Sequence, residues 1–406
     1  MTVSFELDGE VLLFEPGAGE LFLLNSAASV VWLCREDGLS PDEAAEELAR
    51  IADIPLSQAR QDCAAIFSQW ENQRLTAAAG PHSREQTHLR PTSWPDPSIV
   101  TPAAEDSSTL QRTYQIADFR FVLRSGRTAS DTGVHEFLGY LEVPPGTEPA
   151  HILDLNQTDS DWQLSLAGKV IDRTKTADGL LPMLHRCLLV AALRGSHAAA
   201  ALHAGVLLYR GSTILLAGTS GSGKSTLTAA LMANGFEYFG DDMALLSRPP
   251  VRVRGVPSRV RLLEESWPLI LPLWPQLANV PAHRRHDGRM VRYFVPDEYS
   301  APQQPGTGRP ADLLIFPQYR ENAQLSLEAL SRGQALVLLT EAGYNFSEIL
   351  TERLVRDFID WLAELDCFRL EYASLDDAVM EIQSLVESSE QRSEQSADGA
   401  HDGPGS

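Results

Sequence analysis

One stretch of this chain decides its fold: Gly218-Thr219-Ser220-Gly221-Ser222-Gly223-Lys224-Ser225-Thr226. It matches the pattern G-x-x-x-x-G-K-[ST] at every fixed position, which is the phosphate-binding P-loop, or Walker A motif. The glycines let backbone N–H groups surround phosphate oxygens, Lys224 reaches the β- and γ-phosphates, and the Ser225 hydroxyl is placed to hold Mg²⁺. A strand pattern at 213–217 precedes the loop and a helix pattern at 225–234 follows it. The sequence therefore predicts an α/β fold that binds a nucleotide, with ATP and Mg²⁺ as the expected cofactors.

The composition is that of a globular protein with more than one domain. The chain has 406 residues, 43% of them hydrophobic and 22% charged, which is too long for one ordinary core. The formal net charge of −22 argues against broad binding to nucleic acid or to an anionic membrane, because both need a basic surface. The sequence shows neither a signal-peptide pattern nor a membrane-spanning apolar run, which predicts a cytoplasmic protein. The four cysteines lack metal-binding spacing and are interpreted as buried thiols.

Periodicity and composition divide the chain into four segments. The first combines alternating strand patterns with three amphipathic helix patterns, one of which opens with the capping box Ser40-Pro41-Asp42-Glu43. The second is rich in proline and poor in aliphatic residues, and the last is rich in polar residues, so neither can form a core. The expected segments are a small α+β domain at 1–76, a flexible linker at 77–110, a nucleotide-binding domain at 111–386 with an accessory region at 111–200 and a core at 201–386, and a disordered tail at 387–406.

Two adjacent carboxylates follow the next strand pattern after the P-loop helix. The run Tyr238-Phe239-Gly240 predicts a short strand that ends at Asp241 and Asp242, and ligands bind at such strand ends in parallel sheets. One carboxylate can hold Mg²⁺, directly or through water, and the other can accept the proton of an attacking hydroxyl. His203 opens the strand before the P-loop strand, where a histidine is more often structural than catalytic.

Arginines are concentrated beyond this strand. Residues 243–293 hold nine arginines against three acidic residues, in a chain that is acidic as a whole. Because guanidinium groups bind phosphate and carboxylate in a bidentate way, the segment can clamp ATP phosphates or an acidic group of a substrate. The alternative is a solvated loop beside its counter-charges. Arg259 and Arg261 are the best candidates for binding, because they are nearest to the two aspartates in sequence.

These motifs resemble, in order and spacing, the HPr kinase/phosphorylase family and its relatives. The resemblance rests on His203-x-Gly205-Val206, the P-loop, the helix that ends at Gly235 and the Asp241-Asp242 pair. It implies a P-loop kinase domain with an HPr-kinase-like sheet and transfer of the ATP γ-phosphoryl group to a protein serine. It also implies roles for single residues: Asp241 as general base, Asp242 as a Mg²⁺ partner, His203 as a residue that orients or tunes Asp241, and Lys224 within the phosphate cradle.

The chain departs from that family in two places. HPr kinases have Ser-Glu after the P-loop lysine, whereas this chain has Ser225-Thr226. The glycine-rich signature that the family has nearer its C-terminus is replaced by GVPSRVRL at 255–262. The substrate is therefore expected to differ from HPr, and the reverse phosphorolysis of that family is not assumed.

The first segment resembles a second family. The sequence LNSAASVVW at 24–32 follows a predicted hairpin and resembles the PqqD family, whose small winged-helix-like domains recognise leader regions of ribosomally made, modified peptides. A three-stranded sheet with an open edge can accept an extended peptide as an added strand. Trp32 is assigned to the core. By this resemblance the edge strand would consist of Leu21, Phe22, Leu23 and Leu24, facing the helix at 59–70.

Together these features predict an enzyme that uses ATP and Mg²⁺ to phosphorylate a serine of a ribosomal precursor peptide. Precursors of lasso peptides are the first class of substrate to consider. The N-terminal domain would hold the leader, and the linker would raise the effective concentration of the rest of the peptide at the kinase site to about millimolar. Two alternatives stay open: a leader-binding chaperone whose P-loop is a nucleotide switch, and a small-molecule kinase with a regulatory first domain. The oligomeric state is also open, with a homo-oligomer among the alternatives.

Overall fold

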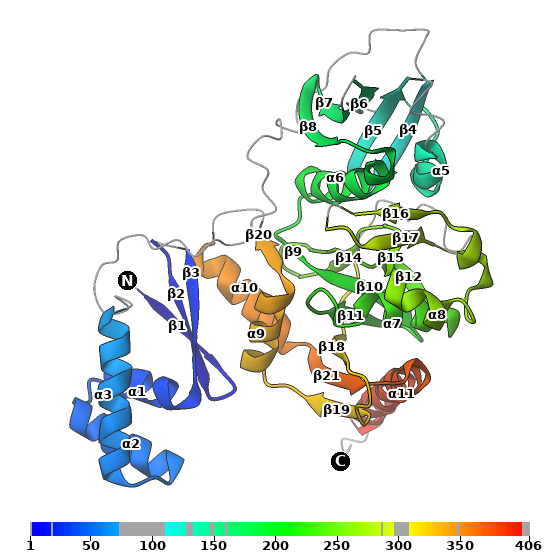
Figure 1. Cartoon of the computed structure of the whole chain (residues 1–406). Helices are drawn as coiled ribbons and strands as arrows, with labels where there is room; N and C mark the ends of the chain where they lie inside the picture. The colour runs from blue at the N-terminus through cyan, green and yellow to red at the C-terminus, as the bar shows by residue number, and fades with distance from the viewer. Residues whose placement is uncertain are drawn as a thin grey trace, which may run out of the picture. The chain divides into compact units, whose positions relative to one another are not determined.

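The computed structural model describes most of the chain, and its contacts divide it into two compact units. Unit 1 comprises Met1–Thr87, Ala329–Thr340 and Glu348–Cys367, and unit 2 comprises the remaining residues. Figure 1 shows the elements of each unit. The described residues are 2–17, 19–72, 110–126, 133–146, 150–158, 161–285, 287–295, 308–346 and 350–399.

The N-terminal part of unit 1 is a three-stranded antiparallel sheet followed by three helices. The strands pair in the order β1-β2-β3, so β3 is at an edge of this sheet. Val11 and Leu13 pack with Trp32 and Trp70 in one core. The predicted capping box is confirmed at the start of α2, where side chains and backbone of Ser40 and Glu43 bond reciprocally. The elements are β1 (Val3–Leu7), β2 (Glu10–Glu15), β3 (Glu20–Leu24), α1 (Ser26–Glu36), α2 (Pro41–Ala52) and α3 (Leu56–Asn72).

Two helices from the C-terminal part of the chain also contribute to unit 1. They are α9 (Arg332–Ala342), whose last two residues fall in unit 2, and α10 (Glu352–Ala363). The backbone N–H of Arg332 donates to the Asp8 carboxylate at 2.8 Å, and the Arg356 guanidinium lies 5.0 Å from the centre of the Phe5 ring. The sequence analysis grouped these helices with the nucleotide-binding core. An amphipathic pattern shows which helix face is buried but does not show what buries it.

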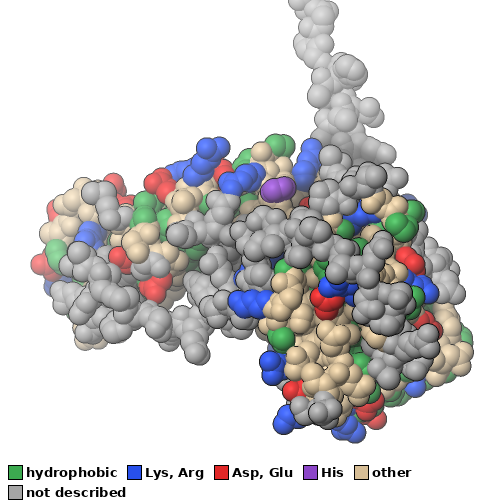
Figure 2. All heavy atoms as spheres, turned by 90° about the horizontal axis from the view of Figure 1, so that it is seen from above, with side chains coloured by type: hydrophobic (Ala, Val, Ile, Leu, Met, Phe, Trp, Pro, Cys, Tyr) green, Lys and Arg blue, Asp and Glu red, His purple; other side chains and the backbone are tan. Residues whose placement is uncertain are grey.

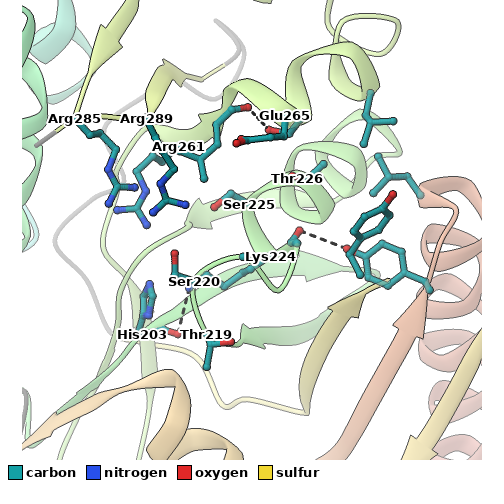
Figure 3. Close-up of a pocket in the computed structure, with 18 residues that line it drawn as sticks. His203, Thr219, Ser220, Lys224, Ser225, Thr226, Arg261, Glu265, Arg285 and Arg289 are labelled. Carbon is teal, nitrogen blue, oxygen red and sulfur yellow. Dashed lines mark hydrogen bonds between the residues drawn. The ribbon is translucent and has the colours of Figure 1, made fainter. Parts of the chain in front are cut away.

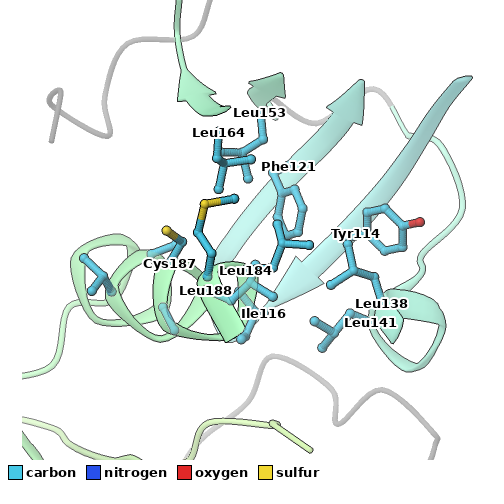
Figure 4. Packing of buried hydrophobic residues seen from close by; sticks show 14 of the residues in the cluster. Tyr114, Ile116, Phe121, Leu138, Leu141, Leu153, Leu164, Leu184, Cys187 and Leu188 are labelled. Atoms are coloured by element: carbon cyan, nitrogen blue, oxygen red, sulfur yellow. The ribbon is translucent and has the colours of Figure 1, made fainter. Parts of the chain in front are cut away.

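Unit 2 begins with a five-stranded sheet, the accessory region of the sequence analysis, and the helix α6 (Leu180–Gly195). The strand order is β4-β5-β6-β7-β8, antiparallel except for the parallel pair of β5 and β6. Leu184 and Leu188 of α6 share a hydrophobic cluster with Ile116 and Phe121 of the sheet (Figure 4). The elements are β4 (Leu110–Ile116), β5 (Phe119–Ser125), α5 (Val134–Leu138), β6 (His151–Gln157), β7 (Trp162–Leu166) and β8 (Lys169–Thr174), with 3-10 turns at Gly139–Leu141 and Ala177–Gly179.

The main sheet of unit 2 has six strands in the order β12-β10-β11-β18-β21-β19. Strand β10 pairs antiparallel with β11 and β12, whereas β11 pairs parallel with β18. The α/β class predicted from the sequence is confirmed, although the sheet has more antiparallel pairing than simple alternation of strands and helices implies. The elements are β10 (Ala204–Tyr209), β11 (Ser212–Ala217), α7 (Lys224–Ala233), β12 (Glu237–Gly240), β18 (Leu313–Tyr319), β19 (Ser326–Ala329) and β21 (Asp366–Tyr372).

Two smaller sheets complete the described part of unit 2. The first has the order β14-β13-β9-β20 and the second β15-β17-β16. The first consists of β14 (Val253–Gly255), β13 (Ala244–Leu246), β9 (Ala200–Leu202) and β20 (Tyr344–Phe346). The second consists of β15 (Val260–Leu263), β17 (Met290–Phe294) and β16 (Ala282–Arg284), with α8 (Trp267–Ile270) and 3-10 turns at Glu264–Ser266 and Pro275–Asn279 between β15 and β16.

The last helix, α11 (Leu375–Gly399), is longer than the sequence predicted. It continues through 387–399, where a disordered tail was expected, because serine, glutamate and glutamine are compatible with a helix once a preceding turn exists. Residues 400–406 and 77–109, which make up the rest of the predicted tail and nearly all of the predicted linker, lie outside the described residues. Among the helices of the described ranges, none is both long and apolar enough to cross a bilayer.

The close approach of two backbones at the end of β12 predicts the effect of a methyl group there. A Cβ added at Gly240 would lie 2.4 Å from the carbonyl oxygen of Val256, closer than any such atom can approach. Gly240→Ala should therefore force β12 away and destabilise unit 2 by about 1–3 kcal/mol, measured as a lower thermal unfolding midpoint. Gly139→Ala is the matched control, because nothing lies within 4 Å of its added Cβ. Equal midpoints for both variants would contradict the prediction.

Candidate active site

The P-loop connects the end of β11 to the start of α7. Gly221 and Gly223 have φ angles of 92° and 93°, a backbone conformation that glycine adopts at no steric cost, so both positions require glycine. Lys224, the first residue of α7, is 6% exposed, and its Nζ lies 3.4 Å from the carbonyl oxygen of His203. Burial lowers the pKa of Lys224, while the nearby Asp242 and Asp241 oppose that shift. The loop thus joins strand β11 to helix α7, as the sequence predicted, and its lysine lies against the residue between β9 and β10.

Asp241 lies directly against the P-loop. Its side chain is fully buried, and its Oδ2 accepts a hydrogen bond of 2.7 Å from the hydroxyl of Ser225. Its Oδ1 has no hydrogen-bond partner among the residues that the structure describes. Burial, and then repulsion from Asp242, raise the pKa of Asp241 above the ordinary value. Asp241 is thus a buried carboxylate with one open oxygen and an increased affinity for a proton.

Asp242 has the opposite environment. The Arg261 guanidinium forms an ion pair with its Oδ1 at 3.2 Å, and His185 Nε2 lies 2.8 Å from its Oδ2. Burial alone would raise the pKa of Asp242, but Arg261 and the hydrogen bonds from His185 and His203 outweigh burial and hold that pKa well below its ordinary range. The sequence predicted Ser225 and Asp242 as a pair of metal ligands. In the structure the Ser225 hydroxyl instead donates to Asp241.

His203 approaches Asp242, not Asp241. Its Nε2 lies 3.6 Å from Asp242 Oδ1, whereas the sequence-based expectation placed it beside Asp241. Its Nδ1 lies 2.9 Å from the carbonyl oxygen of Ala342. Because a carbonyl can only accept, Nδ1 carries a proton and donates it to this bond, which fixes the ring orientation. A third of the side chain is exposed, and it lines the pocket described below.

Of the two arginines singled out from the sequence, only Arg261 is at the site. Arg259 donates to the carbonyl oxygens of Phe137 and Glu136 at 2.9 and 3.1 Å, and its guanidinium lies 5.1 Å from the Tyr140 ring centre. Its role in substrate binding stays a prediction, but two of its donors bond backbone carbonyls of the accessory region, and it is not among the pocket-lining residues. Distance along the sequence from the aspartates could not reveal this.

Two arginines that the sequence did not single out also line the pocket. Arg285 and Arg289 line the same pocket as Arg261, and Figure 3 shows the three guanidinium groups gathered on one side of it. Asp287 forms ion pairs with Arg285 and Arg289 at 3.3 and 2.8 Å. Burial, and then the charge of Arg261, lower the pKa of Arg285, which indicates excess positive charge. This arginine cluster, defined as Arg261, Arg285 and Arg289, is therefore suited to bind an anion.

The pocket itself has a charged end and an apolar end. It is a cavity of roughly 340 Å³ beside the P-loop, with the arginine cluster and Lys224 at the charged end. Apolar side chains also line the pocket: Leu269 and Tyr319, which are 47% and 44% exposed, and Leu375. The Tyr372 hydroxyl donates to the carbonyl oxygen of Gly223 at 3.4 Å, which ties the apolar end to the loop. Such a cavity fits a molecule that carries phosphates on one side and an aromatic ring on the other.

The predicted peptide-binding edge lies in unit 1. In β3, Leu21, Phe22 and Leu23 are half-buried and Leu24 is buried. Because β3 is an edge strand of the three-stranded sheet, its outer backbone groups are placed to pair with an added strand. On helix α3, Trp70 is buried edge-on against Trp32 of α1, with ring centres 5.2 Å apart. Trp32 is 5% exposed and belongs to the core, as the sequence analysis assigned it.

Comparisons with known proteins found one matching family and similar solved structures. Residues 10–75 match the family described as coenzyme PQQ synthesis protein D (PqqD), so the N-terminal part of the chain is a PqqD domain, as predicted. A structure described as TbiB1 in complex with the TbiA(beta) leader peptide is 24% identical and covers 20% of this chain and 93% of its own, with a TM-score of 0.18. The HPr(Ser) kinase/phosphatase from Coxiella burnetii is 14% identical and covers 50% of this chain and 99% of its own, with a TM-score of 0.26. No curated protein matches the chain.

The opposite environments of the two aspartates predict opposite effects on stability. Since the raised pKa of Asp241 means that its charge is disfavoured in the folded state, Asp241→Asn should raise the thermal unfolding midpoint at neutral pH. Asp242→Asn should destabilise the fold by about 1–3 kcal/mol and so lower the midpoint, because the substitution removes the ion pair with Arg261 and weakens the hydrogen bond from His185.

The pH dependence supplies the control for this pair. The folded pKa of Asp242 is depressed, so its contribution is complete above its unfolded value of about 4 and is lost as the pH falls toward the folded value. Unfolding midpoints measured between neutral and acidic pH should therefore converge for wild type and Asp242→Asn at low pH. A destabilised Asp241→Asn variant, or a difference for Asp242→Asn that does not shrink in acid, would contradict this account.

Proposed function

We propose that this protein is a kinase that uses ATP and Mg²⁺ to phosphorylate a serine hydroxyl of a ribosomally made precursor peptide, which its PqqD domain holds by the leader. The observation that carries the proposal is the contact between the P-loop and the buried aspartate pair: Ser225 donates to Asp241, and Asp242 holds Arg261 at the pocket wall. A loop that only binds nucleotide has no need for two buried carboxylates, whereas phosphoryl transfer needs positioned charge and a proton acceptor.

The donor atoms at the loop suit Mg²⁺. The metal prefers hard oxygen ligands and is usually bound by one or two carboxylates together with substrate phosphates. Among the described residues no cluster of three or more His, Cys, Asp or Glu could hold a metal without such help. Ser225 Oγ would be one ligand with Asp242 as its proposed partner, and the open Oδ1 of Asp241 makes Asp241 a second candidate. When bound, Mg²⁺ would neutralise charge on the transferred phosphate.

Asp241 is the proposed general base. In the reaction the serine oxygen bonds to the γ-phosphorus, the bond from that phosphorus to the β-phosphate oxygen breaks, and the serine proton passes to a carboxylate. The raised pKa of Asp241 makes it the better proton acceptor of the pair, and its Oδ1 is open. Asp242, with its pKa held low by Arg261, stays ionised and fixes that arginine. Lys224 and the arginine cluster supply the positive charge opposite the phosphates.

The PqqD domain supports a peptide substrate. Its edge strand β3 offers backbone groups to an extended leader, and one of the similar structures is described as a complex with a leader peptide. Figure 2 shows basic side chains interspersed with acidic ones over the face drawn, and the net charge is −22, which suits a peptide partner better than nucleic acid or an anionic membrane. We place the reaction in the cytoplasm, where ATP is available, and leave the lasso class of precursor as the first substrate to try.

The direct test is to incubate the protein with Mg·ATP and a precursor peptide and to measure added phosphate by mass spectrometry. Asp241→Asn should reduce transfer by about 100-fold or more while the affinity for Mg·ATP stays within a few-fold of wild type. A loss of Mg²⁺-dependent ATP binding in this variant would assign Asp241 to the metal instead. The intact precursor should also be phosphorylated faster than its leaderless form at low peptide concentration, because the leader raises the effective concentration of the acceptor.

Three results would point away from the proposal. Leader and ATP that both bind without phosphate transfer would favour a chaperone with a nucleotide switch. Equal phosphorylation rates for the intact and leaderless peptides would exclude a role of the PqqD domain in recognising the leader. Transfer to a small molecule that does not depend on any peptide would favour a small-molecule kinase with a regulatory first domain.

The apolar end of the pocket predicts a separate contribution to ATP binding. If the adenine ring packs there, Tyr319→Ala should weaken ATP binding about tenfold, since stacking of a base on an aromatic side chain contributes about 1–3 kcal/mol. Inorganic tripolyphosphate, which has no ring, should bind the variant as well as wild type by calorimetry. Leu325→Ala is the control, because Leu325 is similarly exposed and is not among the pocket-lining residues. An equal loss for both ligands would place the ring elsewhere.

A further inference from the structure

One polar side chain is buried in the helix that carries the accessory core. The buried residues of α6 are otherwise apolar, among them Leu184, Cys187 and Leu188, which pack toward the five-stranded sheet. His185 is 5% exposed and sits among them. An imidazole is costly to bury unless its polar atoms find partners, so its position needs a specific explanation. The sequence analysis gave it no role.

The partner of His185 is an aspartate of the candidate active site. His185 Nε2 lies 2.8 Å from Asp242 Oδ2, and the side chains are 6% and 2% exposed, so water does not compete for this bond. The ionised carboxylate can only accept, so the ring donates from Nε2. The His185 ring is also held by Tyr293 of β17, with ring centres 5.0 Å apart. The imidazole is therefore fixed from two sides.

This bond determines how Asp242 is oriented. With Oδ2 bound to His185, the other oxygen, Oδ1, is directed at the Arg261 guanidinium, 3.2 Å away. Arg261 lines the pocket at its charged end, while His185 does not line it. His185 reaches the pocket through Asp242, whose Oδ1 faces the two pocket-lining side chains Arg261 and His203, so its role there is a positioning role.

We propose that His185 is a positioning residue of the phosphoryl-transfer site: its Nε2–H bond to Asp242 Oδ2 holds that carboxylate so that Arg261 is presented to the phosphate oxygens. The inference rests on the proposed kinase function and adds that the accessory region is part of the catalytic unit. The plain alternative is that His185 only fills space between α6 and β17.

Two substitutions separate positioning from packing. His185→Gln keeps an N–H donor at the end of the side chain, whereas His185→Phe keeps a ring against Tyr293 but removes the donor. His185→Phe should lower kcat for peptide phosphorylation about 10–100-fold, with a smaller change in KM for the peptide, and His185→Gln should recover most of that loss. Cys187→Ala, a buried change on the same helix without contact to Asp242, is the control and should stay near wild type. If His185→Phe does not fold, His185→Ala takes its place.

A binding measurement tests the same chain of contacts without relying on catalysis. His185→Phe should weaken the binding of inorganic tripolyphosphate about tenfold in the wild-type background and have no further effect in an Arg261→Met background, because its influence passes through Arg261. If the two substitutions are coupled in tripolyphosphate binding but no phosphate is transferred to peptide, the kinase proposal is contradicted and the positioning role of His185 is retained. Additive effects of the two substitutions, or equal losses in His185→Gln, His185→Phe and Cys187→Ala, would overturn the role of His185.

Discussion

The burial of two adjacent carboxylates is the constraint on which the rest of unit 2 depends. Asp241 and Asp242 follow β12 with almost no exposed surface, and a buried charge is tolerated only when neighbours replace the water that it has lost. The replacements come from separate segments: the P-loop through Ser225, β15 through Arg261, and α6 through His185. These segments must converge at the end of β12. The need to compensate the charges of Asp241 and Asp242 therefore brings together the P-loop, strand β15 and helix α6.

The same constraint makes the two carboxylates unequal. Each has lost its water, and Asp242 receives a guanidinium and two imidazoles in its place. Asp241 receives the Ser225 hydroxyl, a bond of 3.5 Å from the Arg261 backbone N–H and the attraction of Lys224, which do not outweigh burial and the repulsion of its neighbour. The pKa of Asp241 is therefore raised and that of Asp242 is lowered, although the two residues are adjacent in sequence and both are buried. A site built in this way has one carboxylate that stays charged and organises cations, and one that is poised to exchange a proton. A single carboxylate would be enough to hold a metal. The two different tasks give a chemical reason for the second one.

Sequence reasoning succeeded where a function depends on local pattern. The P-loop, the strand ending at Asp241, the capping box at Ser40 and the PqqD resemblance are all encoded in short runs of residues. It did not find His185, which lies 57 residues from Asp242 and belongs to no motif, nor could it choose Arg285 and Arg289 among nine arginines. The same limit applies to Arg259, two of whose donors bond backbone carbonyls of α5 that are 122 and 123 residues away. Contacts set by tertiary packing leave no periodic signal in a single sequence.

In the proposed kinase, a separate domain that binds the leader would complement the pocket. Its walls offer charge at one end and apolar surface at the other, and this pattern selects for a nucleotide but carries little shape information about a peptide acceptor. Arginine side chains that are partly exposed bind anions of many geometries, so discrimination between serines has to come from elsewhere. In the proposed function the PqqD domain would supply it by binding the leader, because leader and acceptor belong to one peptide and binding the first concentrates the second. The catalytic site can then be optimised for the phosphate and leave the choice of substrate to the edge of a small sheet.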